Sequence, residues 1–296
     1  MFKGSLVALV TPFGSDNRVD FASLKRLIDF HVDQGSDGLV VAGTTGESAT
    51  LAKSEHIELI ARAVEIADGR LPIIAGTGSN STAQTVDLSR AVADTGIDAY
   101  LIVVPYYNKP MQEGLFRHFT VIADTVQKPL MMYNVPGRTV ADMLPETVAR
   151  LAHHENIFAI KEATGDIDRL RAIRSLIDDD FKLFSGDDFT LLPFIEAGGH
   201  GVVTVSGNVA AGPVAELCRL ASAGSKKEAK ALDKTLQPLN EMLFVESNPI
   251  PVKWAVSQMG LMEPHIRLPL TPYSEQHHEA MRSAMRVAGL SVEESA

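Results

Sequence analysis

The stretch Ile157-Phe158-Ala159-Ile160-Lys161 is too short for a typical helix, and four of its five side chains are apolar. A run of this kind is typical of a strand that is buried on both faces, as the strands of a parallel sheet are. Seven further short apolar runs occur at residues 6–10, 38–42, 72–76, 99–104, 129–133, 182–185 and 201–205. The sequence therefore predicts eight buried strands.

The segments between these runs have helical periodicity. In the first of them, Leu24, Leu27, Ile28 and His31 recur at the spacing of one helix face. Strand–helix alternation repeated eight times over roughly 220 residues predicts an α/β protein with the fold of a (β/α)8 TIM barrel. A doubly wound open sheet is the alternative, but the first strand runs into residues 11–14 (Thr-Pro-Phe-Gly), which lack the glycine-rich phosphate loop of that fold.

The strand pattern ends after Gly224, and residues 225–246, 250–259 and 274–287 have a helical pattern with Pro238 as an expected kink or break. We therefore predict a (β/α)8 catalytic barrel at residues 1–224 and a C-terminal helical domain at residues 225–296. Within the barrel, Thr82 and Asp188 lie where side chains that cap helix N-termini are expected.

The composition excludes several classes of protein. The chain of 296 residues has 27 Lys+Arg against 37 Asp+Glu, and a net charge of −10 argues against nucleic acid or an anionic membrane as a partner. One cysteine cannot form an internal disulfide or a thiolate metal site. The apolar run at residues 6–10 ends at Pro12, short of a secretory signal, and no stretch reaches the roughly 18 apolar residues of a membrane span. We expect a cytoplasmic protein.

Functional side chains of such a barrel lie at the carboxyl ends of its strands and in the loops that follow. Lys161 ends the sixth predicted strand, so its amine is expected inside the barrel mouth. Burial lowers the pKa of a lysine, and a neutral amine attacks carbonyl carbon to form a Schiff base. The alternative is a lysine that extends to water or pairs with the adjacent Glu162.

Neighbouring strand ends supply further polar groups. Tyr133 ends the fifth strand, where a phenol can relay protons, although a lone tyrosine is more often a core residue. Thr44 and Thr45 lie between two glycines, which suits recognition of a small carboxylate as well as a plain tight turn. Arg138 follows Pro136-Gly137 and is either a clamp for a second carboxylate or a surface arginine.

Three motifs connect these residues in order along the chain. Residues 43–47 are Gly-Thr-Thr-Gly-Glu, residues 133–139 are Tyr-Asn-Val-Pro-Gly-Arg-Thr, and residues 160–163 are Ile-Lys-Glu-Ala. Further stretches of the same pattern are 104–110, 185–188 and 246–253. Together the motifs resemble those of the dihydrodipicolinate synthase family, in the superfamily of pyruvate aldolases and N-acetylneuraminate lyases. The resemblance runs through nearly the whole chain.

The resemblance implies a lyase that condenses pyruvate with L-aspartate 4-semialdehyde, on the diaminopimelate route to lysine, without a metal or an organic cofactor. It implies that Lys161 forms the Schiff base with pyruvate. Tyr133, Thr44 and Tyr107 would relay protons, with Tyr107 reaching across a dimer interface into a neighbouring site. The implied assembly is a homotetramer, built as a dimer of dimers.

The resemblance also implies how the two anionic substrates are held. Thr45 would bind the carboxylate of pyruvate, and Arg138 would bind the carboxylate of the semialdehyde at the site entrance. Gly186 and Val203 would place backbone carbonyls near Lys161.

Lysine-regulated members of the family bind lysine at the tight dimer interface. Residues that match this pattern here are Ser48, Ala49, His56, Asn80 and Tyr106. Gln84 stands where such members carry Glu, and Lys53 where some carry His. Loss of a carboxylate removes a charge-assisted hydrogen bond worth about 1.5–3 kcal/mol to the lysine ammonium, and Lys53 adds repulsion. We therefore predict weak or absent inhibition by lysine.

Two other functions stay open at this point. The first is another class I pyruvate aldolase of the superfamily, such as an N-acetylneuraminate lyase or a 2-keto-3-deoxy sugar-acid aldolase, although Arg138 and the Tyr106-Tyr107 pair favour the synthase. The second is a barrel that senses small keto acids without catalysis, against which Lys161, Tyr133 and Arg138 argue together.

Overall fold

Eight parallel strands close into a barrel in which each strand pairs with the next and β1 pairs with β8. The computed structural model describes residues 2–291. The strands are β1 (Gly4–Ala8), β2 (Gly38–Val41), β3 (Ile73–Gly76), β4 (Ala99–Val103), β5 (Leu130–Asn134), β6 (Ile157–Glu162), β7 (Lys182–Ser185) and β8 (Gly201–Thr204). All eight predicted strands are confirmed to within two residues, and so is the (β/α)8 class.

Side chains alternate between the two faces of each strand, and this divides the core into two clusters. Ala159 on β6 and Met131 on β5 point into the barrel, where they pack in an inner cluster with residues of the other strands. Ile160 and Met132 point outward into the larger cluster between strands and helices. Both faces are therefore apolar, which is why the strands form unbroken apolar runs in the sequence.

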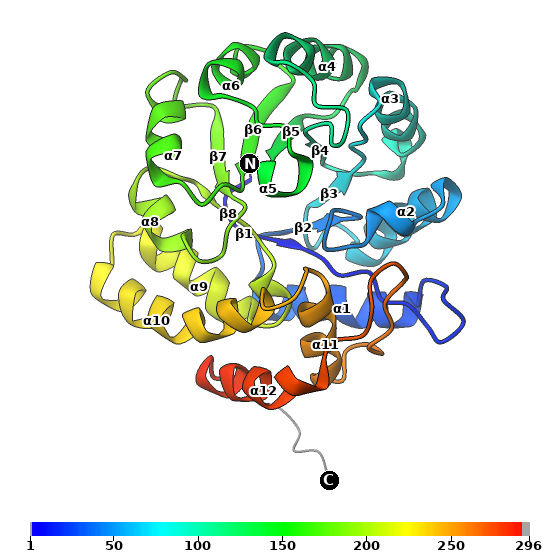
Figure 1. Cartoon of the computed structure of the whole chain (residues 1–296), viewed down its shortest axis with the longest axis vertical. Helices are drawn as coiled ribbons and strands as arrows, with labels where there is room; N and C mark the ends of the chain where they lie inside the picture. Colours follow the sequence, from blue (N-terminus) through cyan, green and yellow to red (C-terminus); the bar gives the residue numbers. More distant parts are fainter. Residues whose placement is uncertain (1, 292–296) are drawn as a thin grey trace.

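Helices form an outer ring around the strands (Figure 1). They are α1 (Phe21–Gln34), α2 (Lys53–Ala67), α3 (Thr82–Ala91), α4 (Gln112–Thr125), α6 (Pro145–Ala152), α7 (Ile167–Arg174), α8 (Leu191–Glu196) and α9 (Ala211–Ser222). The predicted face of α1 is confirmed, because Leu24, Leu27, Ile28 and His31 are all buried.

Local signals decide where some of these helices begin and end. The Asp20 carboxylate accepts hydrogen bonds from the backbone N–H groups of Ala22 and Ser23 at the start of α1. Gly35 ends the same helix with φ of 75°, which a glycine adopts without steric cost. The expected cap at Thr82 is wrong by one residue, because the Ser81 side chain accepts from the backbone N–H of Gln84.

Short elements occupy the loops at the carboxyl ends of several strands. The one-turn helix α5 (Pro136–Thr139) follows β5 and contains Arg138. The short 3-10 segments η1 (Ser48–Thr50) and η3 (Ser206–Asn208) follow β2 and β8, whereas η2 (Ala93–Thr95) lies between α3 and the amino end of β4. Most of the candidate residues therefore lie at one end of the barrel, with the loops that follow the strands.

The C-terminal part of the described chain is helical, with α10 (Lys226–Leu243), α11 (Ile250–Gln258), η4 (Glu275–His277) and α12 (His278–Val287) gathered beside the barrel (Figure 1). Of the kink or break expected at Pro238, the break is wrong, because α10 runs through this residue. Leu236 and Leu239 on either side are buried, and packing of α10 against α9 and α12 offsets the lost hydrogen bond.

The division of the chain into two domains at Gly224 stays a prediction. None of the helices in residues 2–291 is long and apolar enough to cross a membrane.

Candidate active site

Lys161 and Tyr133 are direct neighbours across the β5–β6 pair, and both point into the barrel mouth. The Lys161 side chain is 5% exposed, and its Nζ lies 4.2 Å from the centre of the Tyr133 ring. Burial lowers the pKa of Lys161 to about 7, and the nearby charge of Arg138 acts in the same direction. A large fraction of this amine is therefore neutral near neutral pH, which is the form that attacks a carbonyl.

The alternative of an ion pair between Lys161 and Glu162 is wrong. Adjacent residues on a strand point to opposite faces, so Glu162 lies outside the barrel wall. There its carboxylate accepts hydrogen bonds from Asn134 and Arg169. Among the described residues, no carboxylate lies within ion-pair distance of the Lys161 amine.

Asp188 is a neighbour of Lys161 whose role was missed in the sequence. The expectation that it caps a helix is wrong, because α8 begins after Thr190. Its buried carboxylate accepts instead from the Thr204 hydroxyl and from the backbone N–H groups of Val205 and Ser206, at 2.5, 2.8 and 3.0 Å. Burial raises the pKa of Asp188, and the Asp188 charge in turn raises the pKa of Lys161 against the effect of burial.

Two further predicted residues line the space around Lys161. A Cβ atom at Gly186 would lie 2.9 Å from Lys161 Cε and 2.5 Å from Ala163 Cβ, so only glycine fits there. Val203 on β8 is buried in the inner cluster. The structure thus brings Gly186 next to Lys161 and places Val203 on the same inner face.

Thr44 lies beside Tyr133 and interacts with its hydroxyl. Burial raises the pKa of Tyr133, while the charge of Arg138 and a hydrogen bond with Thr44 partly oppose this effect. Tyr133 is therefore a protonated phenol at neutral pH. The arrangement can hold or pass a proton next to the Lys161 amine.

Asn248, in the segment before α11, contacts both predicted carboxylate-binding residues. Its side-chain amide donates to Thr45 Oγ1 at 3.0 Å, and its backbone carbonyl accepts from Arg138 Nη2 at 3.2 Å. Asn248 is buried and its Oδ1 has no hydrogen-bond partner. Asn248 lies within residues 246–253, one of the stretches that carry the family resemblance, but the motif by itself indicates no role for its side chain.

A buried ion pair anchors the threonine turn from the other side. Lys253 Nζ lies 2.5 Å from Glu47 Oε1, and both side chains are about 1% exposed. The second Glu47 oxygen accepts from the backbone N–H of Arg267 at 3.1 Å. Glu47 has φ of 54°, an uncommon conformation for a residue with a side chain. The pair thus joins the turn after β2 to the C-terminal helices.

Tyr107 is not brought together with the other candidates within this chain. Its side chain is 86% exposed and its φ is 74°. The neighbouring Tyr106 is anchored through its carbonyl, which accepts from the Asn80 side chain at 3.2 Å. The loop after β4 therefore leaves the Tyr107 side chain at the surface of the single chain.

The residues predicted for lysine regulation come from the loops after β2, β3 and β4 and from the helices α2 and α3. His56 is buried and its Nε2 bonds the Gly76 carbonyl at 2.8 Å. Gln84 Oε1 accepts from the Ser79 hydroxyl at 2.9 Å. Ser48 and Ala49 are at least partly exposed in η1. Lys53 forms an ion pair with Asp87, so its charge is balanced within the chain.

The fold and this site define a (β/α)8 barrel with a buried, unpaired lysine at its mouth. The model of the dihydrodipicolinate synthetase family matches residues 1–288, and the chain belongs to this family. A 4-hydroxy-tetrahydrodipicolinate synthase of Pseudomonas syringae pv. syringae is 52% identical over 292 residues, which cover 99% of this chain and 100% of that protein. The predicted family and enzyme class are confirmed, and relatives of this name support the predicted activity.

Solved structures agree with this assignment. The chloride-inhibited dihydrodipicolinate synthase of Acinetobacter baumannii, in complex with pyruvate, superposes with a TM-score of 0.96 at 46% identity and covers 98% of this chain and 100% of that one. The dihydrodipicolinate synthase of Cyanidioschyzon merolae with lysine bound gives a TM-score of 0.94 at 40% identity, with 98% and 99% covered.

Proposed function

We propose that the chain acts as a 4-hydroxy-tetrahydrodipicolinate synthase through a Schiff base between Lys161 and pyruvate. The single observation that carries this proposal is the buried Lys161 amine, whose pKa is lowered to about 7, in contact with Tyr133 at the barrel mouth. The neutral amine attacks the keto carbon of pyruvate, and water leaves as the imine forms. The protonated imine then acts as the electron sink for loss of a methyl proton, which yields an enamine.

The enamine carbon attacks the aldehyde carbon of L-aspartate 4-semialdehyde, and the aldehyde oxygen takes up a proton. The amino group of the bound semialdehyde then attacks the imine carbon, the Lys161 amine leaves, and the ring closes. Tyr133 and Thr44 pass the protons, together with Tyr107 of the partner subunit. The exposure of Tyr107 in the single chain supports this last role and a dimer at least, and we extend the proposal to a homotetramer.

Substrate recognition is local in this proposal, because both substrates are anions and the chain has a net charge of −10. Thr45 holds the carboxylate of pyruvate, and backbone carbonyls of Gly186 and Val203 lie near the imine. Arg138 binds the carboxylate of the semialdehyde. The contacts of Asn248 with Thr45 and Arg138 support a common site for the two carboxylates. We also propose a cytoplasmic location, which the use of a single cysteine supports.

The deciding experiment is borohydride reduction in the presence of pyruvate alone, followed by peptide mass spectrometry. We expect one reduced pyruvate unit on Lys161 and none on Lys182. Lys182 is the first residue of β7, so it lies at the end of the barrel opposite the mouth. Absence of an adduct on Lys161 would refute the mechanism. A second assay compares condensation of pyruvate and aspartate semialdehyde with cleavage of N-acetylneuraminate and 2-keto-3-deoxygluconate; a preference for the sugar acids would favour the other aldolases.

We further propose that lysine inhibits this enzyme weakly. Gln84 provides an amide where a carboxylate would attract the lysine ammonium, and this difference carries the proposal, because the Lys53 charge that was expected to repel lysine is paired with Asp87. We expect Gln84→Glu to tighten lysine binding about tenfold, since a charge-assisted hydrogen bond is worth about 1.5–3 kcal/mol. Calorimetric titration of both proteins with L-lysine measures this. Sub-millimolar inhibition of the unmodified enzyme contradicts the proposal.

A further inference from the structure

On the outer face of the β5–β6 pair, the polar side chains are those of one cross-strand pair, Asn134 and Glu162, directly behind the candidate active site. Tyr133 pairs with Lys161, and the next residues along, Asn134 and Glu162, pair with each other. Because side chains alternate along a strand, the first pair points into the barrel and the second points out, under α7 and the loop after α5. Both outward residues are almost fully buried.

The register of these two strands is irregular at their other end. Leu130 pairs with Ile157 but Met131 pairs with Ala159, so Phe158 is an extra residue in β6. A slip of one residue turns every side chain of a strand to the opposite face, which here would turn Lys161 out of the barrel. The contacts at the carboxyl end of the pair therefore have to hold the register.

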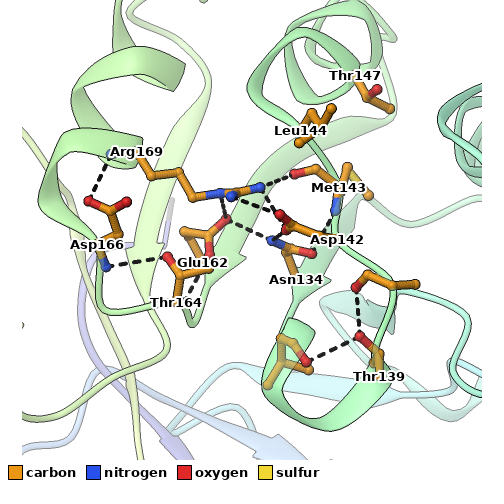
Figure 2. A network of polar contacts seen from close by, with 12 residues as sticks. Asn134, Thr139, Asp142, Met143, Leu144, Thr147, Glu162, Thr164, Asp166 and Arg169 are labelled. Carbon is orange, nitrogen blue, oxygen red and sulfur yellow. Dashed lines mark hydrogen bonds and ion pairs between the residues drawn. The ribbon is translucent and has the colours of Figure 1, made fainter.

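Those contacts form one closed network (Figure 2). The Asn134 amide donates to Glu162 Oε2 and to Asp142 Oδ1, each at 3.0 Å, and its oxygen accepts from the Met143 backbone N–H at 3.0 Å. Glu162 Oε1 accepts from the Thr164 backbone N–H at 2.9 Å. Every polar atom of the Asn134 and Glu162 side chains thus has a partner.

Arg169 on α7 lies between the two carboxylates of this network. Its Nε donates to Glu162 at 3.2 Å, while Nη1 and Nη2 donate to the two Asp142 oxygens at 3.0 and 2.7 Å. Nη2 also donates to the Met143 carbonyl at 2.5 Å. The Arg169 side chain is 13% exposed, and a planar guanidinium is the one cationic group that matches this set of acceptors.

The Arg169 charge opposes the effect of burial on the Glu162 carboxyl. Burial raises the pKa of Glu162, and the charge of Arg169 is the main effect that opposes this rise. The Glu162 charge also acts on the phenol of Tyr133. Loss of Arg169 therefore leaves a buried carboxylate without a counter-charge, directly behind the two reacting side chains.

We infer that Arg169 is a positioning residue of the enzyme: through Glu162 and Asn134 it holds the β5–β6 register that sets Lys161 against Tyr133. Arg169 lies on the far side of the barrel wall from Lys161 and acts through these neighbours without touching the reacting atoms. The inference rests on the proposed Schiff-base function. It predicts an effect on the chemical step and little effect on binding of pyruvate, because Thr45 and Asn248 belong to other elements.

The test measures borohydride-trapped imine on wild type, Arg169→Met and Arg169→Lys as a function of pyruvate concentration, together with steady-state kcat and KM. Arg174→Met is the matched control, since Arg174 is on the same helix and pairs at the surface with Asp179. For Arg169→Met we expect kcat and the trapping rate to fall about 10- to 100-fold, with KM for pyruvate changed less than about threefold. Arg169→Lys, which keeps the charge but loses the planar fork, is expected to recover part of this loss.

A purely structural role gives a different result. Arg169→Met, measured below its unfolding temperature, would then keep kcat within about twofold of wild type, and this outcome overturns the inference. If Arg169→Met does not fold, the variants Arg169→Lys and Asp142→Asn test the inference instead. We expect each of them to lose about three- to tenfold in kcat. An unchanged kcat in both variants overturns the inference. If wild type itself forms no adduct with pyruvate, the proposed function fails instead.

Discussion

Two buried lysines of this protein differ in one contact. Lys161 at the end of β6 is 5% exposed and Lys253 on α11 is 1% exposed, and each amine lies over an aromatic ring, at 4.2 Å from Tyr133 and 4.3 Å from Phe13. Lys253 bonds the Glu47 carboxylate at 2.5 Å, whereas Lys161 has no such partner. Burial lowers the pKa of Lys161 to about 7 and that of Lys253 to about 8, with Glu47 opposing the shift at Lys253.

The difference shows that burial alone does not make a lysine a nucleophile. The Lys253 ammonium is held by a carboxylate and closed off in the core, where it joins the C-terminal helices to the turn that contains Thr44 and Thr45. The Lys161 amine faces the barrel mouth, and the Asp188 carboxylate, whose charge acts on it, already accepts hydrogen bonds from three donors. One lysine therefore contributes to structure, and the other is available for chemistry.

The largest expected effect comes from removing the reactive amine. Lys161→Met should reduce synthase activity by at least about 10⁴-fold, because the proposed covalent intermediate cannot form. The fold should be kept, since the substitution removes a buried amine that has no ion-pair partner. Activity and the thermal unfolding midpoint measure both effects, with Lys182→Met as the control. Near-normal activity in Lys161→Met would assign the nucleophile elsewhere.

The structural lysine should give the opposite result. Lys253→Met leaves the Glu47 carboxylate buried without its partner, which should cost about 3–5 kcal/mol in free energy of unfolding. The double variant Glu47→Gln/Lys253→Met should recover much of that loss, because no charge is left uncompensated. Urea unfolding of the three proteins measures this. A single variant as stable as wild type would show that the pair contributes little.

The smallest effect concerns the pH at which Lys161 reacts. Because its pKa is about 7 and the neutral amine is the nucleophile, imine trapping should rise with pH through about 7. The Asp188 charge raises the pKa of Lys161, so Asp188→Asn should move this rise to lower pH. Arg138→Met should move it to higher pH, since the Arg138 charge lowers that pKa. Shifts of the same sign in both variants would contradict this electrostatic account.

Much of the fold was predictable because buried parallel strands have a strong local signal. All eight runs were found, and the fifth and sixth placed Tyr133 and Lys161 at neighbouring strand ends. The helix caps were predicted less well, since Ser81 and Thr82 both suit the position and only the backbone conformation chooses between them. Asp188 matched a cap in sequence, yet its carboxylate turns inward to the backbone after β8, because the parallel pairing of β7 with β8 brings that loop within reach.

The sequence by itself determined the barrel, the position of Lys161 and the family, because these follow from short-range periodicity and from motifs contiguous along the chain. Only the tertiary structure decided what surrounds the lysine. Asn248 reaches Thr45 across 203 residues of chain, Lys253 reaches Glu47 across 206, and Arg169 joins strands β5 and β6 from the outer layer. Such contacts have no local signal, because desolvation and pairing of charges depend on which distant segments are packed together.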